Sequence, residues 1–151
     1  MSQATLPGFS DAADYLTKTE QELNDRQRES VTFSRQTAID AIWEVWLPCK
    51  EPNWDGENAI AISETTFENA YRLIDALPHG FPSPTVTAEP DGHLNLEWYK
   101  NPRRILSVSV SPRSLLHWAA LIGSEDPRGS CRFFDEVPKS LRYYIGRVFA
   151  G

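Results

Sequence analysis

Cysteine is scarce in this sequence, which has only Cys49 and Cys131, and neither lies in a Cys-x-x-Cys motif. Two cysteines are too few for the disulfide framework of a small secreted domain. The sequence also lacks a run of about 18 apolar residues, the length that spans a membrane. It lacks the basic stretch followed by an apolar core that is typical of a secretory leader. These absences predict a cytoplasmic protein that does not contact a membrane.

Motifs that hold phosphates or metals are missing as well. There is no Gly-x-x-x-x-Gly-Lys and no Gly-x-Gly-x-x-Gly. His79, His93 and His117 are far apart in the chain, and no pair of them has the spacing expected for one metal ion. No nucleophile elbow is present either. We therefore expect no cofactor and no metal, and the sequence favours a non-enzymatic protein without excluding an enzyme.

Charge is distributed unevenly along the 151 residues, whose formal net charge is −6. Residues 1–99 hold 6 Lys/Arg against 17 Asp/Glu, and residues 100–151 hold 9 against 4. The balances are therefore −11 and +5. Such asymmetry attracts charged partners or lets the two parts of one fold attract each other, and we favour the second interpretation.

Strand-like runs occupy residues 93–99, 104–110 and 115–121, and a weaker run covers 130–134. In the first two runs apolar residues alternate with polar ones, as in half-buried strands. A three-residue loop with Gly92 in the left-handed conformation would pair Ala88 with Leu94. The same loop length at 100–102 and 111–113 places even-numbered residues on one apolar face. These residues are Val86, Ala88, Leu94, Leu96, Trp98, Leu106, Val108, Val110, Leu116, Trp118 and Ala120.

The odd-numbered face of this predicted sheet is mostly polar. The loop lengths place Asn95 opposite Ser107, and Ser107 beside His117 on the next strand. With Ser109 and Glu97 nearby, this cluster suggests a hydrolase as the third functional hypothesis, because a serine beside a base is the minimal nucleophilic pair. A solvated sheet face is the more common role for such residues.

Helices are predicted over residues 36–47, 63–77 and 138–149. In the first, Ile39, Ile42, Trp43 and Trp46 follow helical spacing and predict an inward stripe. The second has an apolar stripe of the same kind, made by Phe67, Ala70, Tyr71, Ile74 and Leu77. The fold class is therefore α+β, an antiparallel meander of four or five strands with helices packed on one face. Residues 36–151 form the predicted single domain, and residues 1–35 form an N-terminal extension.

Candidate protein-binding residues lie in the extension and in one turn. Leu16 and Leu23 belong to a thin apolar stripe on a predicted helix over residues 10–28, which would fray unless it packs on a partner or on the domain. Trp54 lies in the Asn53-Trp54-Asp55-Gly56 turn. Trp54 either anchors an interface or fills the core while Asp55 and Gly56 make the bend, and we favour the core.

Arginines in the C-terminal half support a second hypothesis, a small nucleic-acid-associated factor. The candidate contacts are Arg103, Arg104, Arg113, Arg128, Arg132 and Arg142. Trp98, Tyr99 and Tyr143 are candidates to stack on bases. The acidic net charge, the absence of a nucleic-acid-binding motif and the predicted burial of Trp98 weigh against it.

The Asn53-Trp54-Asp55-Gly56 turn and the hairpin from Asp91-Gly92 to Leu96-Glu97-Trp98 resemble a group of small uncharacterised bacterial proteins. The likeness covers about residues 53–149. It implies a bacterial protein associated with mobile elements or defence, and it brings no activity, cofactor or catalytic residue.

The leading functional hypothesis is a non-enzymatic protein-binding module: a complex subunit, an antitoxin-like neutraliser or a defence accessory. It depends on the acidic N-terminal part, the thin stripe with Leu16 and Leu23, and the absence of an assembled catalytic set. Another protein is the expected partner, and nucleic acid is the alternative partner.

Overall fold

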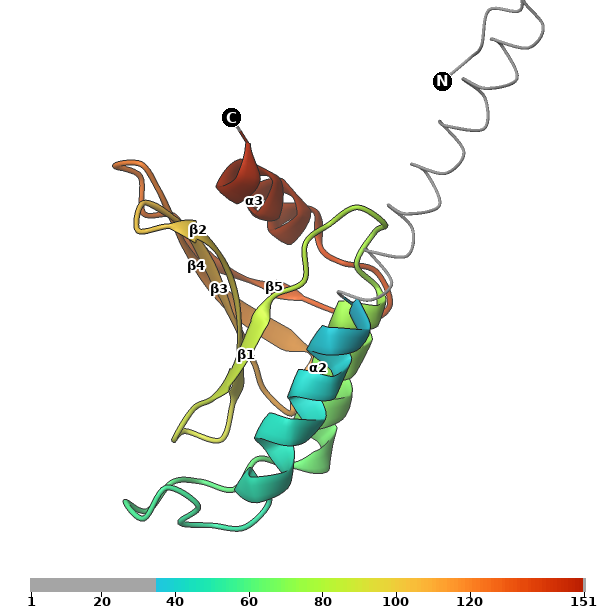
Figure 1. Cartoon of the computed structure of the whole chain (residues 1–151), viewed down its shortest axis with the longest axis vertical. Helices are drawn as coiled ribbons and strands as arrows, with labels where there is room; N and C mark the ends of the chain where they lie inside the picture. The colour runs from blue at the N-terminus through green and yellow to red at the C-terminus, as the bar shows by residue number, and fades with distance from the viewer. Residues whose placement is uncertain (1–34, 151) are drawn as a thin grey trace, which may run out of the picture.

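The computed structural model describes residues 35–150 and contains one five-stranded antiparallel sheet (Figure 1). Its strands are β1 (Thr85–Ala88), β2 (Leu94–Asn101), β3 (Arg104–Val110), β4 (Leu115–Ile122) and β5 (Arg128–Arg132), adjacent in chain order. Residues 35–46 form a helix, continued by the short 3-10 helix η1 (Leu47–Cys49); α2 (Glu64–Asp75) and α3 (Lys139–Phe149) follow. The predicted α+β meander is confirmed, with the weaker run contributing a fifth strand.

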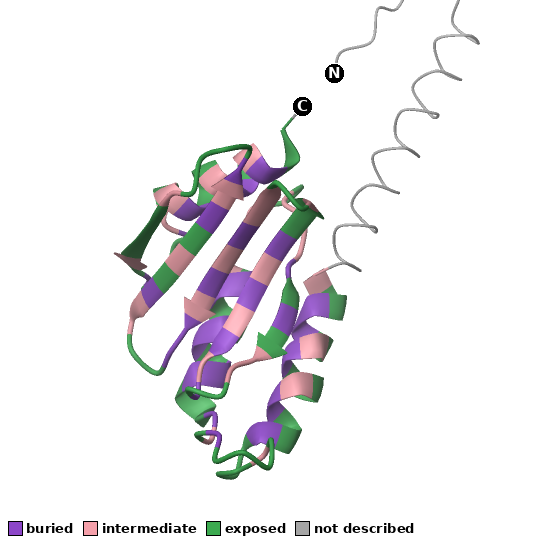
Figure 2. Ribbon diagram, turned by 90° about the vertical axis from the view of Figure 1, so that its left-hand side faces the viewer, coloured by how far each residue is buried: buried purple, intermediate pink, exposed green. Residues whose placement is uncertain are grey.

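The molecule has two layers, with α2 and α3 packed against one face of the sheet (Figure 1). Between the layers lies a core of buried apolar side chains that includes Leu94, Leu96, Trp98 and Leu106 from the sheet. Within residues 35–150 no helix covers the other face (Figure 2). None of the described helices is long and apolar enough to span a bilayer. The division between residues 1–35 and 36–151 stays a prediction.

The first hairpin has the predicted register, in which Ala88 pairs with Leu94. Gly92 has a φ of 90°, and its N–H donates to the carbonyl oxygen of Glu89 at 3.0 Å. An added Cβ on Gly92 would lie 2.9 Å from Cγ2 of Ile60. Glycine is therefore required at position 92 for two reasons, the positive φ of the backbone and the close approach of Ile60.

The next two registers were predicted wrongly by two residues. Asn95 pairs with Ser109, not Ser107, and His117 also pairs with Ser109. Strand β2 continues to Asn101 through an irregularity after Tyr99, which lengthens the pairing. A shift of two residues keeps every side chain on its face, so the apolar pattern cannot detect it.

The helix 35–46 and α2 pack side by side in the helix layer. Trp46 is buried, and its indole N–H donates to the carbonyl oxygen of Ile62 at 2.9 Å. Trp43, predicted to lie in the core, is 44% exposed, and Tyr71 of α2 is 37% exposed. The prediction was wrong because the apolar stripe of each helix is wider than the surface that the helix buries, and both residues lie at the edge of their stripe.

Two further contacts hold the layers together. The buried Asn69 of α2 donates its side-chain amide to the carbonyl oxygens of Ser111 at 2.9 Å and Arg113 at 3.3 Å. The second contact is between β4 and α3, where Trp118 packs on Tyr144 with ring centroids 4.8 Å apart. Gly129 pairs with Trp118, and a Cβ on Gly129 would lie 3.0 Å from the indole ring. Trp118 is thus half-buried and faces the helix layer, as predicted.

Candidate functional sites on the open sheet face and the helix layer

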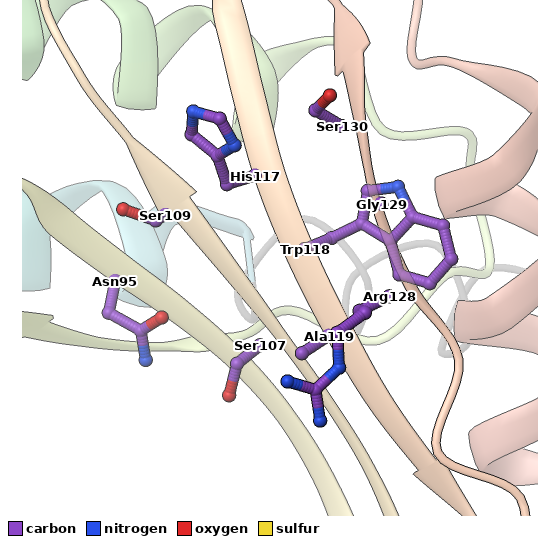
Figure 3. Close-up of a pocket in the computed structure, with 9 residues that line it drawn as sticks. All are labelled: Asn95, Ser107, Ser109, His117, Trp118, Ala119, Arg128, Gly129 and Ser130. Carbon is purple, nitrogen blue, oxygen red and sulfur yellow. The ribbon is translucent and has the colours of Figure 1, made fainter.

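The uncovered face of the sheet, here called the open face, carries short polar side chains in cross-strand rows. One row contains Thr87, Asn95, Ser109, His117 and Ser130, and the next contains Thr85, Glu97, Ser107, Ala119 and Arg128. A hollow of about 470 Å³ lies over the β2–β5 part of these rows (Figure 3). It is lined by Asn95, Ser107, Ser109, His117, Arg128 and Ser130, together with Trp118, Ala119 and Gly129. The rows therefore form a concave surface rich in hydrogen-bonding groups.

A serine–histidine contact lies at the edge of this hollow, although not the predicted one. Ser109 Oγ is 2.8 Å from Nδ1 of His93, and Asp91 Oδ2 is 3.6 Å from the same nitrogen. Asp91 also accepts a hydrogen bond from the backbone N–H of His93 at 3.0 Å. In a serine–histidine–aspartate relay the serine and the carboxylate use different ring nitrogens. Asp91, His93 and Ser109 therefore do not form such a relay.

A second hollow of about 310 Å³ lies at the β3–β4 turn end of the open face. His93 and His117 line it together with Ser111, Pro112, Arg113 and Leu115. His117 lines both hollows, so they adjoin each other. Among the described residues no group of three or more His, Cys, Asp or Glu side chains is arranged to hold a metal ion.

The six candidate arginines separate into two sets. Arg128 and Arg132 project from β5 on the open face, and Arg113 lies in the β3–β4 turn at its second hollow. Arg103 lies in the turn at the other end of the sheet, where its guanidinium donates to the carbonyl oxygen of Gly123. Arg104 donates to the carbonyl oxygen of Arg147 in α3, and Arg142 is exposed on α3 itself. The fold therefore brings only Arg113, Arg128 and Arg132 together on one face.

Aromatic side chains form a second surface, on the helix layer. Trp43 and Phe67 have ring centroids 4.5 Å apart, and Phe67 and Tyr71 have centroids 6.4 Å apart. These three residues, here called the aromatic surface, line an apolar hollow of about 310 Å³ with Glu68 and Arg72. Exposed acids lie at helical spacing from two of the rings: Asp40 from Trp43, and Glu64, Glu68 and Asp75 from Tyr71.

Trp54 and Asp55, the described candidates for protein binding, are engaged within their own turn. Trp54 is half-buried against the core, and its indole N–H donates to the carbonyl oxygen of Ile60 at 2.9 Å. Asp55 Oδ1 accepts from the backbone N–H groups of Glu57 at 2.8 Å and Ala59 at 3.0 Å. Gly56 has a φ of 77°. Asp55 and Gly56 thus make the bend and Trp54 packs partly on the core. Contact of Trp54 and Asp55 with a partner stays a prediction, and Leu16 and Leu23 lie outside the described residues.

Both cysteines lie in environments that disfavour a thiolate. Burial raises the pKa of the Cys49 thiol, and the Asp55 carboxylate raises it further. Burial also raises the pKa of Cys131, although a hydrogen bond with Ser140 opposes this shift. Both thiols are therefore protonated near neutral pH, which makes them poor nucleophiles.

The pKa of Arg147 in α3 is raised by its hydrogen bonds with Glu125, at 2.8 Å, and with Tyr143.

Residues 35–150 form a small α+β domain with one polar sheet face that no described helix covers and one apolar hollow on the helix layer, lined by aromatic rings with Glu68 and Arg72. The chain matches no family model, no curated protein and no solved structure in comparisons with each. Sequence reasoning missed the aromatic surface because it assigned Trp43 and Tyr71 to the core. The signal that could have found it was the acids at positions 40, 64 and 68, whose helical spacing places a charge beside Trp43 and Tyr71.

Proposed function

We propose that this chain is a non-enzymatic protein-binding module that uses the aromatic surface to hold an amphipathic helix of a partner protein. The observation that carries the proposal is the exposure of Trp43, 44% open to solvent beside the hollow that it shares with Phe67 and Tyr71. Large exposed aromatic side chains grouped around an apolar hollow mark interaction surfaces.

The aromatic surface has the features of a binding hot spot. Phe67 stacks on the buried Trp46, with ring centroids 4.6 Å apart, and Trp43 packs on Phe67. Trp43 and Tyr71 are thus backed by a packed aromatic cluster, which limits the side-chain entropy lost on binding. Trp and Tyr in such settings contribute most of the binding energy at interfaces.

Charge around the hollow indicates the chemistry of the partner. Five exposed acids lie on the two helices, namely Asp40, Glu44, Glu64, Glu68 and Asp75, against two basic residues, Arg35 and Arg72; of these, Glu68 and Arg72 line the hollow itself. A helix with an apolar stripe and flanking Lys or Arg complements both features. We therefore assign the site to a basic amphipathic helix.

The cellular role follows from the same proposal. A complex subunit, an antitoxin-like neutraliser and a defence accessory would each need such a surface, and the resemblance to small bacterial proteins favours a bacterial, defence-associated role. Both cysteines are free thiols, which agrees with a reducing cytoplasm. Leu16 and Leu23 remain further candidates for partner contact.

The test is a nuclease-treated affinity capture from the native host with the full chain and with the W43A/Y71A variant. We expect a protein that binds the wild-type chain and loses at least about 30-fold in affinity for the variant, since the loss of even one hot-spot residue costs about 2 kcal/mol or more. Binding of the purified partner is then measured by calorimetry.

The matched control is Y99A/Y143A, which removes two aromatic side chains that are 51% and 56% exposed elsewhere on the surface. It should bind the partner as the wild type does. A partner that binds W43A/Y71A as tightly as the wild type, or one whose contact segment is acidic, would contradict the proposal. Thermal melting of each variant checks that it is folded.

A further inference from the structure

The open face has two chemically different sides across its width. Arg128 and Arg132 lie on β5, and Arg113 lies in the turn that leads into β4. On β2 the same face carries Asn95 and Glu97. Between the two sides lie Ser107, Ser109 and His117, so the face changes from basic to neutral to acidic.

The arginines of this face retain capacity for a ligand. Among the described residues, Arg128 is the one of the three with an ion pair, and that pair, with Asp126, is 3.8 Å long and exposed to solvent. Figure 3 shows the Arg128 side chain lying across β4 beside Ala119, within the hollow of about 470 Å³. Guanidinium groups present planar, paired donors that match phosphate oxygens.

The groups opposite the arginines suit the edge of a nucleic-acid base. Asn95 offers both a donor and an acceptor, Glu97 offers acceptors, and the hydroxyls of Ser107 and Ser109 offer both. Tyr99, 51% exposed, lies further along β2 on the same face and can stack on a base. The hollow of about 470 Å³ is shallow and open to solvent, a shape that suits a strand lying across the sheet.

We propose that the open face binds nucleoside phosphate units, with phosphates along β4 and β5 and bases over β2 and β3. The ligand class is a single-stranded nucleic acid or a free nucleotide, which share this chemistry. The site is separate from the aromatic surface and does not depend on the proposed protein partner. Glu97 would repel phosphates from β2, which fixes the orientation.

The experiment measures fluorescence anisotropy of a labelled single-stranded oligoribonucleotide of mixed sequence with the full chain, between about 50 and 200 mM salt. For R128A/R132A we expect an affinity lower by about tenfold or more. The slope of log affinity against log salt should fall by about 1.4, since each phosphate contact in a single strand contributes about 0.7. The control R103A/R142A removes two arginines that lie off the open face and should change neither quantity.

A third variant, A119W, fills the hollow without removing charge. Ala119 is exposed on β4, where tryptophan is tolerated in a strand. We expect weaker binding with an unchanged salt slope, and far-UV circular dichroism confirms folding. W43A/Y71A changes the aromatic surface and not the open face, so it should bind the oligoribonucleotide as the wild type does. The nucleotide-binding proposal and the protein-binding proposal can therefore fail independently of each other.

Competition experiments distinguish a free nucleotide from a single-stranded nucleic acid as the ligand. Displacement of the oligoribonucleotide by nucleoside monophosphates assigns the hollow to a free nucleotide, and displacement by unlabelled strand alone assigns it to a strand. The proposal is overturned if no saturable binding occurs, if R103A/R142A loses as much affinity as R128A/R132A, or if poly-glutamate displaces the strand equally well.

Discussion

At the scale of single residues, a few side chains in unusual positions fix the local geometry. Gly92 makes the first hairpin turn and touches Ile60, whose own N–H donates to the carbonyl oxygen of Pro90 at 2.8 Å. The sequence predicted the conformation of Gly92, because a turn rich in Pro, Asp and Gly has few alternatives. It could not predict the contact with Ile60, since that contact joins segments about 30 residues apart and depends on tertiary packing.

Replacing Gly92 with alanine should lower the free energy of unfolding by about 1–3 kcal/mol, from backbone strain at positive φ and the overlap with Ile60. Urea denaturation measures the change. The matched control is G146A in α3, where nothing lies within 4 Å of the added Cβ. It should raise stability by about 0.5–1 kcal/mol, because alanine favours a helix interior. Equal effects of the two substitutions would refute this account.

At the scale of elements, the strands were easier to predict than their pairing. Alternation placed β2, β3 and β4 within about two residues and assigned the correct faces. The loop lengths then misplaced Ser107 beside His117, because shifting a strand by two residues leaves the same side chains buried. Asn69 helps to hold β3 and β4 against the helix layer, because its buried amide donates to carbonyl oxygens in the turn between those strands. A lone polar residue in a helix gives no sequence signal of such a contact.

Substituting Asn69 with leucine should therefore destabilise the protein by about 2–3 kcal/mol. The change leaves the carbonyl oxygens of Ser111 and Arg113 without their donor, and buried unpaired carbonyls are costly. Guanidinium chloride unfolding followed by tryptophan fluorescence gives the value. E68L, on an exposed neighbouring position of α2, serves as the control and should stay within about 0.5 kcal/mol of wild type. A stable N69L would show that the contact is dispensable.

At the scale of the whole molecule, the charge asymmetry of the sequence separates elements of the fold. The helix 35–46 and α2 carry five exposed acids, whereas α3 carries basic residues and three of the C-terminal arginines lie on the open face. The sequence favoured attraction between the two parts of the fold. Among residues 35–150, the ion pairs are Arg128–Asp126, Arg147–Glu125 and His93–Asp91, and none of them joins residues 35–99 to residues 100–150. Attraction between the two parts therefore stays a prediction.

Removing residues 1–30 should leave a chain that unfolds cooperatively with a melting temperature within a few degrees of the full chain. The reason is that the core described here begins at Ala38 and ends at Val148. Differential scanning calorimetry tests this. Partner affinity measured on the same truncated chain then separates the two candidate contacts: an unchanged affinity excludes Leu16 and Leu23, and a loss includes them. A chain that fails to fold would contradict the predicted boundary near residue 35.

Among residues 35–150, each strand of the sheet pairs only with the strands next to it in the chain. Each hairpin can therefore close over a short loop before the next one forms, and little chain entropy is lost in any single step. For a β-rich protein this order favours rapid folding through successive local steps. Ribosomal synthesis would also deliver the strands in the order in which they pair, so a growing chain need not wait for its C-terminus to start the sheet.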